Sequence, residues 1–204
     1  MSTPLLMRRR RAGSESGQSL LEFGLVLPLA LVLALGVTEV SYALLDQHIV
    51  TKLTREGSNL ISRDTSPLDA ATALASMTTP PVNFATGAKV IFSVIKNVQT
   101  VGAPNVNKNI LYQRYVYGSL SDPSAKSTLN TVTPVGGNLG SSPEFQAPNS
   151  DTDTGLQITN LPAGLVVAGG MLYVTEIYSN HQLITPLDKF GIQVPPLLYS
   201  IAYF

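Results

Sequence analysis

The chain of 204 residues contains no cysteine, which excludes disulfide frameworks, Cys-ligated zinc, iron–sulfur clusters and thiol nucleophiles. Its two histidines, His48 and His181, are too few for a multi-histidine metal site within one chain. Charge is scarce too: 13% of residues are charged, and 13 basic residues balance 13 acidic ones. A net charge of zero argues against a nucleic-acid-binding protein, because a basic binding surface would make the net charge positive. We therefore expect no nucleic-acid partner.

The motifs of common enzymes are also missing. The sequence has no G-x-S-x-G elbow, no phosphate loop and no dinucleotide fingerprint. Asp151 and Asp153 stand in a D-T-D-T-G string that resembles the start of a calcium loop, but the third oxygen ligand and the terminal Glu are absent. That string therefore indicates a polar turn. His181 has no carboxylate beside it in the sequence and is expected at the surface. We expect no catalytic residue, no metal and no cofactor.

The most apolar stretch of the chain follows a basic block, Arg8 to Arg11. Between Glu22 and Glu39 lie 16 uncharged residues. The run of residues 20–45 would form a helix about 39 Å long, and a bilayer core needs about 20 such residues. The basic block then predicts a cytoplasmic N-terminus and an outer C-terminal domain. The alternatives are a cleaved secretory signal, a plain signal anchor and the buried core helix of a soluble protein.

A short motif lies at the boundary between the basic block and the apolar run. It reads G-Q-S-L-L-E-F and includes Gly17, Gln18, Glu22 and Phe23. A glycine followed by a hydrophobic helix with Glu at its fifth position resembles the processing site of type IV prepilins. The match is closer still to the TadE-like pseudopilins of tight-adherence (Tad/Flp) pili. Later helix residues are similar to that family as well: Glu39, Tyr42, Ala43, Arg55, Glu56 and Gly57.

This resemblance implies that a prepilin peptidase cleaves after Gly17 and removes a basic leader, residues 1–17. The new α-amino group would be on Gln18, and Glu22 with Phe23 would serve assembly. The physics of the site is consistent with this. Gln18 and Glu22 are one helical turn apart, about 6 Å along the axis. A carboxylate in lipid costs roughly 2.5–3.5 kcal/mol unless it has a partner, which a neighbouring subunit's Gln18 amine would supply. A flexible tether without processing is the alternative for Gly17.

The family resemblance implies a structural role rather than catalysis. The expected protein is a minor pilin or pseudopilin of a Tad-type pilus, single-pass in the cytoplasmic (inner) membrane and incorporated in a surface pilus. Its implied partners are the prepilin peptidase, other pilin or pseudopilin subunits, the Tad assembly platform and membrane lipid. The competing hypothesis is a signal-anchored extracytoplasmic binding module without processing.

The fold class expected is α+β, a long N-terminal helix followed by a small antiparallel β-sheet domain at residues 63–204. The helix, residues 18–62, is first transmembrane and then amphipathic, with two helices joined near Glu39 as the alternative. Ser66 predicts the cap of a second helix that ends about Met77. Alternating apolar residues predict the following strands: 90–95, 109–117, 171–178, a short one at 156–159, and 165–168 leading across a turn at Gly169-Gly170.

Two other segments differ from these strands in composition. Residues 118–155 are rich in Gly, Pro, Ser, Thr and Asn and are expected to form a flexible insertion. The apolar residues 191–204 are too short and too interrupted by proline for a second membrane span. They are expected to form a last strand or a subunit contact.

Overall fold

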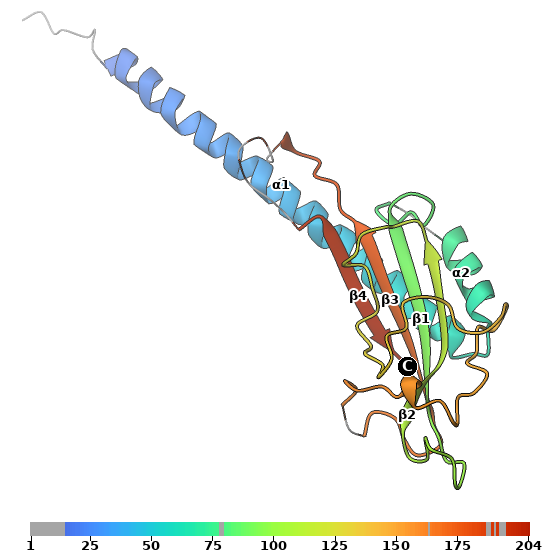
Figure 1. The fold of residues 1–204 in the computed structure, drawn as a ribbon. Coiled ribbons are helices and arrows are strands. Elements are labelled where there is room, and N and C mark those ends of the chain that lie inside the picture. Colours follow the sequence, from blue (N-terminus) through green and yellow to red (C-terminus); the bar gives the residue numbers. More distant parts are fainter. Residues whose placement is uncertain (1–14, 78–79, 163, 187–188, 190, 192–194) are drawn as a thin grey trace, which may run out of the picture.

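A computed structural model of the chain describes residues 15–77, 80–162, 164–186, 189, 191 and 195–204. The helical elements are α1 (Glu15–Ile61), α2 (Pro67–Ser76) and the short 3-10 helix η1 (Thr154–Leu156). The strands are β1 (Ala88–Asn97), β2 (Asn109–Gly118), β3 (Met171–Asn180) and β4 (Leu197–Tyr203). A long helix followed by an antiparallel sheet confirms the α+β class (Figure 1).

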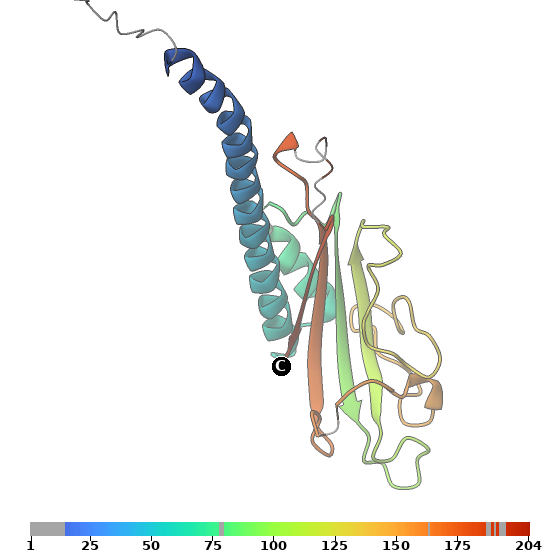
Figure 2. The same cartoon turned by 90° about the vertical axis from the view of Figure 1, so that its left-hand side faces the viewer.

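Helix α1 is continuous over 47 residues and passes through Pro28. The alternative of two helices joined near Glu39 is therefore wrong. Its N-terminal half extends beyond the sheet, and its C-terminal half lies along one face of it (Figure 2). Gly57 allows this close approach, because a Cβ there would lie 2.8 Å from Cγ2 of Thr175. The buried apolar residues of this half are Val50, Leu53 and Ile61.

Helix α2 begins as its sequence predicts. The Ser66 side chain accepts a hydrogen bond from the Asp69 backbone N–H at 3.2 Å, and Pro67 occupies the first helical position. Asp69 adds a negative charge in the first turn, which the helix dipole favours. The predicted cap and second helix are confirmed.

The four strands form one antiparallel sheet in the order β2-β1-β3-β4. The three long predicted strands are confirmed, and the last apolar segment adds β4 at one edge. The predicted strand at 156–159 is wrong: the chain forms η1, capped by Asp153, followed by isolated bridges at Gln157 and Ile158. Residues 165–168 also form no strand, although the turn expected next to them is present, with Gly169 at φ +73°.

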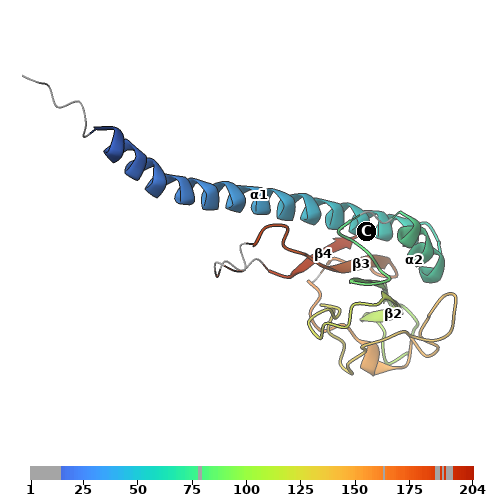
Figure 3. The same cartoon turned by 90° about the horizontal axis from the view of Figure 1, so that it is seen from above.

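The sheet separates two packed layers (Figure 3). Helices α1 and α2 cover one face over the main core, which includes Phe84, Val90, Phe92, Tyr115 and Ile177. Irregular segments cover the other face, where Leu129 packs with Ile95 and Val174. Leu120 and Ala125 pack there with Ile91 and Tyr178. Parts of the 118–155 insertion are thus buried against the sheet, and its expected flexibility stays a prediction.

Candidate functional site

The N-terminal half of α1 exposes its large apolar side chains. Leu20 is 76% exposed, Phe23 64% and Leu33 62%. Within the described part of the chain, residues 17–61 form the one helix long and apolar enough to cross a membrane. An isolated apolar surface of this length is unfavourable in water and favourable in lipid. The helix therefore suggests single-pass membrane anchoring. The basic block at residues 8–11 lies outside the described residues.

The four residues of the predicted processing and assembly site lie in the first turns of α1. Gln18, Glu22 and Phe23 are all exposed, and the Gln18 side-chain amide donates to Glu22 Oε1 at 3.0 Å. A Cβ added to Gly17 would meet no atom within 4 Å, so packing in the described chain does not require glycine there. The structure brings Gln18 and Glu22 together, and the roles of all four residues stay predictions.

Glu39 marks the point where the β-sheet domain reaches the apolar helix. Its side chain is 1% exposed. It accepts hydrogen bonds from the Thr185 hydroxyl at 2.6 Å, the Thr185 N–H at 2.9 Å and the Ile184 N–H at 3.3 Å. These donors come from the connection between β3 and β4. A carboxylate within an apolar sequence thus has its donors inside the protein rather than in lipid.

His181 lies beside Glu39 and is buried. Its Nδ1 is 2.8 Å from Asp46 Oδ2, and its Nε2 is 3.6 Å from Glu39 Oε1. The prediction of a surface histidine is wrong, because both carboxylates lie more than a hundred residues away in sequence. A signal was available: Glu39 and Asp46 are two helical turns apart on the packed stripe of α1. We call these three residues the Glu39–His181–Asp46 cluster. It joins the β3–β4 connection to α1.

A second buried polar group lies on the other face of the sheet. Arg114 is 1% exposed. It donates to the Ser93 hydroxyl at 3.1 Å, the Val135 carbonyl at 2.8 Å and the Ser127 hydroxyl at 2.9 Å. Burial lowers the pKa of Arg114 to about 10, and the charge of Glu176 acts in the opposite direction. Two of these partners belong to the 118–155 insertion, so Arg114 holds it against the sheet.

Glu176 completes this group and is fully buried. Its carboxylate accepts from the Ser127 hydroxyl at 2.5 Å, the Thr128 N–H at 2.8 Å and the Thr128 hydroxyl at 2.7 Å. The Tyr199 hydroxyl donates to it as well, at 3.1 Å. One carboxylate therefore fastens the insertion to β3 and β4. Each of these hydrogen bonds is charge-assisted, which makes it stronger than a neutral one.

The tyrosines around this group predict a loss of stability at alkaline pH. Burial raises the pKa of Tyr178 to about 12 and also raises the pKa of Tyr199. Between pH of about 10 and about 12, the unfolded chain loses these protons while the folded chain keeps them, so folding becomes less favourable as pH rises. Arg114 opposes this trend, because its folded pKa lies below its ordinary value. One arginine is outweighed by the two tyrosines.

We therefore expect the urea midpoint of the detergent-solubilised full chain to fall as pH rises above about 10. Tyrosinate absorbance recorded in the same titration should show ionisation in the native protein only at higher pH than in the urea-unfolded protein. A midpoint that stays constant or rises over this range would contradict the assignment.

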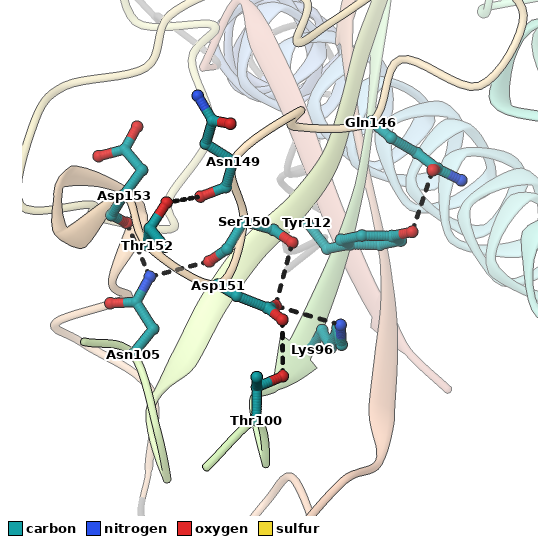
Figure 4. Close-up of polar contacts among 10 residues, drawn as sticks. All are labelled: Lys96, Thr100, Asn105, Tyr112, Gln146, Asn149, Ser150, Asp151, Thr152 and Asp153. Atoms are coloured by element: carbon teal, nitrogen blue, oxygen red, sulfur yellow. Dashed lines mark hydrogen bonds and ion pairs between the residues drawn. The ribbon is translucent and has the colours of Figure 1, made fainter. Parts of the chain in front are cut away.

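The string with Asp151 and Asp153 forms the polar turn that its sequence indicates (Figure 4). Asp151 accepts from the Thr100 hydroxyl at 2.6 Å and pairs with Lys96 at 3.4 Å, and these partners lower the pKa of its carboxyl, with the Thr100 bond contributing most. Asp153 Oδ1 accepts from the Gly155 N–H at 2.9 Å. Among the residues that the structure describes, no group of three or more His, Asp or Glu side chains is placed to hold a metal.

An exposed apolar helix joined to an antiparallel-sheet domain suggests a single-pass, membrane-anchored α+β protein. Residues 17–59 match the family model described as TadE-like protein, about a fifth of the chain, and this confirms the resemblance over the helix. No curated protein and no solved structure matches the chain. TadE-like proteins are structural pilus components rather than enzymes, so the match supports a Tad pilus-associated protein.

Proposed function

We propose that the chain is a minor pilin or pseudopilin that serves as a structural subunit in the assembly of a Tad-type pilus. The observation that carries this proposal is the TadE-like helix itself, in which Glu22 lies one turn from Gln18 on an apolar surface free of the sheet domain. Its partners are other pilus components. The sheet domain lies outside the cytoplasmic membrane, and the subunit enters a surface pilus.

In this proposal a prepilin peptidase cleaves after Gly17. Two features support that step. Gly17 has open space around it, and it is exposed in the first turns of the helix, where a peptidase has access. Cleavage removes the basic leader, which otherwise keeps the N-terminus on the cytoplasmic side.

After cleavage Glu22 sets the axial register between subunits. A carboxylate in an apolar environment is costly when unpaired and tolerated when paired. The α-amino group of Gln18 on a neighbouring subunit supplies the opposite charge, and exposed Phe23 packs next to it. Only one axial offset between two helices satisfies both requirements.

We expect the mature protein in membranes and in sheared surface material to begin at Gln18, as measured by intact mass. Glu22→Ala should reduce the amount of subunit in sheared pili at least about tenfold, since a charge-assisted contact is worth about 1.5–3 kcal/mol. Membrane insertion should be unchanged. Glu56→Ala, which removes a carboxylate from the part of the same helix beside the sheet, is the matched control and should leave assembly intact.

A mature N-terminus at Met1 or Ser2, in cells that contain the peptidase, would overturn the processing proposal. Equal recovery of the Glu22→Ala and Glu56→Ala variants in sheared pili would overturn the register proposal. Both results together would favour a signal-anchored module without processing.

A further inference from the structure

The two edge strands of the sheet, β2 and β4, differ in whether another segment of the chain forms backbone hydrogen bonds with them. At the β2 edge, residues 138–147 add backbone hydrogen bonds. The Arg114 N–H donates to the Phe145 carbonyl at 3.2 Å, and the Leu139 N–H donates to the Arg114 carbonyl at 3.0 Å. The Ala147 N–H donates to the Tyr112 carbonyl at 2.8 Å. The insertion therefore covers the β2 edge, as proteins commonly do to prevent unwanted strand pairing.

At the β4 edge, no further segment of the described chain adds backbone hydrogen bonds, although α1 packs against this strand. Phe204 and Tyr173 exchange both of their backbone hydrogen bonds, at 2.8 and 2.9 Å, and the His181 N–H donates to the Pro196 carbonyl. In an antiparallel ladder this places the even-numbered residues in hydrogen-bonded pairs with β3. The odd-numbered residues then direct their N–H and C=O groups outward from the sheet: Leu197, Tyr199, Ile201 and Tyr203.

In the described chain, two side chains of α1 bond the backbone of β4. The Gln47 amide donates to the outward Tyr199 carbonyl at 2.9 Å, and the Ser58 hydroxyl donates to the Ala202 carbonyl at 3.1 Å. The sequence of β4, LLYSIAY, contains neither the charge nor the proline that commonly protects an edge strand. Tyr203 at its end is 46% exposed. An uncharged edge strand of this length is a template for pairing with another strand.

A cationic hollow lies beside the same edge. Helix α1 packs over β4 and β3, and the C-terminus lies next to its final turns (Figure 2). The hollow has a volume of about 340 Å³, and Phe204, which is 54% exposed, forms one side of it. Its charged lining residues on α1 are two cations, Lys52 and Arg55, and one carboxylate, Glu56, so its net charge is positive. In the described chain neither Lys52 nor Arg55 forms an ion pair with a carboxylate. Side chains of a strand added to β4 would enter this hollow on one face.

We propose that the free edge of β4 binds an extended segment of a partner polypeptide by β-strand addition, and that this segment carries acidic side chains that reach Lys52 and Arg55. The outward backbone groups of β4 supply the affinity, and the charge complementarity supplies the selectivity. This interface goes beyond the proposed function and does not depend on cleavage after Gly17 or on Glu22.

A second copy of the same chain does not fit this edge. In a second copy, the insertion covers the β2 edge. The β4 strand of the first copy therefore cannot pair with the β2 strand of the second. Antiparallel pairing of two β4 strands requires a two-fold axis across the strands, which would point the two α1 helices in opposite directions. Helices anchored in one membrane with the same orientation exclude that arrangement. Parallel pairing of two β4 strands would keep the helices aligned, but a second β4, LLYSIAY, has no acidic side chain to reach Lys52 and Arg55. The segment therefore comes from a different polypeptide.

The test uses the full-length chain in the membranes of its own cells, with the photo-crosslinking residue benzoylphenylalanine in place of Tyr203. We expect a crosslink that peptide mass spectrometry places in an acidic stretch of another polypeptide. The Ile201→Pro variant removes an outward N–H and no hydrogen bond to β3, so it should reduce the crosslink at least about tenfold. Ile201→Ala loses the same apolar packing but keeps the N–H, and it should retain the crosslink.

The charge requirement is tested in the same background. Reversing Lys52 and Arg55 together to Glu should also reduce the crosslink at least about tenfold, whereas Lys108→Glu, at an exposed lysine on the β1–β2 hairpin, should not. A crosslink that survives both Ile201→Pro and the double reversal would overturn the proposal. So would a crosslink only to lipid, to a second copy or to a stretch without acidic residues, or none at all.

Discussion

The Glu39→Ala variant of the full-length protein is expected to lose about 3 kcal/mol of the free energy of unfolding. The Glu39 carboxylate accepts three hydrogen bonds from Ile184 and Thr185. Without Glu39 the two buried Thr185 donors have no acceptor, and His181 has a carboxylate on one side only, that of Asp46. The β3–β4 connection should then separate from α1 before the sheet unfolds. Urea denaturation of the chain in detergent micelles measures the overall loss.

Hydrogen exchange locates the effect of Glu39→Ala. Peptides that cover residues 181–186 should exchange faster in the variant, while those from β1 should change little. Thr38→Ala is the matched control, since Thr38 is exposed and its hydroxyl bonds only to the Ala34 carbonyl of its own helix. We expect that control to lie within about 0.5 kcal/mol of the wild-type chain. Equal stability of the Glu39→Ala and Thr38→Ala variants would show that the connection is held by other contacts.

A measurement of membrane insertion tests whether Glu39 stabilises the sheet domain or instead acts within the lipid. Replacing a carboxylate by alanine in an apolar helix should leave insertion unchanged or improve it, because a charge in lipid is costly. A variant that inserts normally and yet loses domain stability would separate the two contributions of Glu39. A variant that fails to insert would contradict the buried, hydrogen-bonded placement of this carboxylate.

Local sequence signals predicted most of the fold. Strict alternation identified β3, and the Ser66-Pro67 pair with Asp69 identified the start of α2, because strand pleat and helix capping are decided by residues close in sequence. The apolar run and its preceding glycine indicated the resemblance to TadE-like proteins, which the family model confirms over residues 17–59. The strand expected at 156–159 was wrong because Asp153 caps a 3-10 turn there, a side-chain bond to the backbone that competes with strand pairing.

Long-range contacts could not be predicted in the same way. His181 is buried against Glu39 and Asp46, which lie on α1. The residues next to His181 in sequence give no sign that these two carboxylates lie beside it in the fold. In the sequence, Arg114 and Glu176 are charged residues within predicted strands, and nothing near them indicates burial. In the structure both lie under the insertion and are buried. Their partners Ser127 and Thr128 belong to a segment whose composition favours loops, and composition alone does not say where a loop packs.

Replacing Glu176 should have the largest effect on the sheet domain. In Glu176→Leu the Arg114 guanidinium stays buried without its nearby negative charge, and the Thr128 N–H and hydroxyl lose their acceptor. The two charges are linked through the Ser127 hydroxyl rather than by a direct ion pair. Leaving one of two neighbouring buried charges uncompensated costs about 3–5 kcal/mol. We expect a fall of that size in the urea-derived free energy of unfolding, with rapid hydrogen exchange throughout residues 118–155. Glu144→Ala, an exposed carboxylate of the same insertion, should change stability by no more than about 0.5 kcal/mol.

The double variant Arg114→Met with Glu176→Leu separates loss of a charge partner from loss of packing. Apolar replacement of both members of a buried pair is often nearly neutral, because neither charge then has to be desolvated. Here Ser93, Val135 and Ser127 would still lose the guanidinium donor, so we expect the double variant to recover part of the stability rather than all of it. A double variant less stable than Glu176→Leu would mean that Arg114 stabilises the insertion by its own hydrogen bonds even without the carboxylate. Recovery would instead identify the unpaired guanidinium as the main cost.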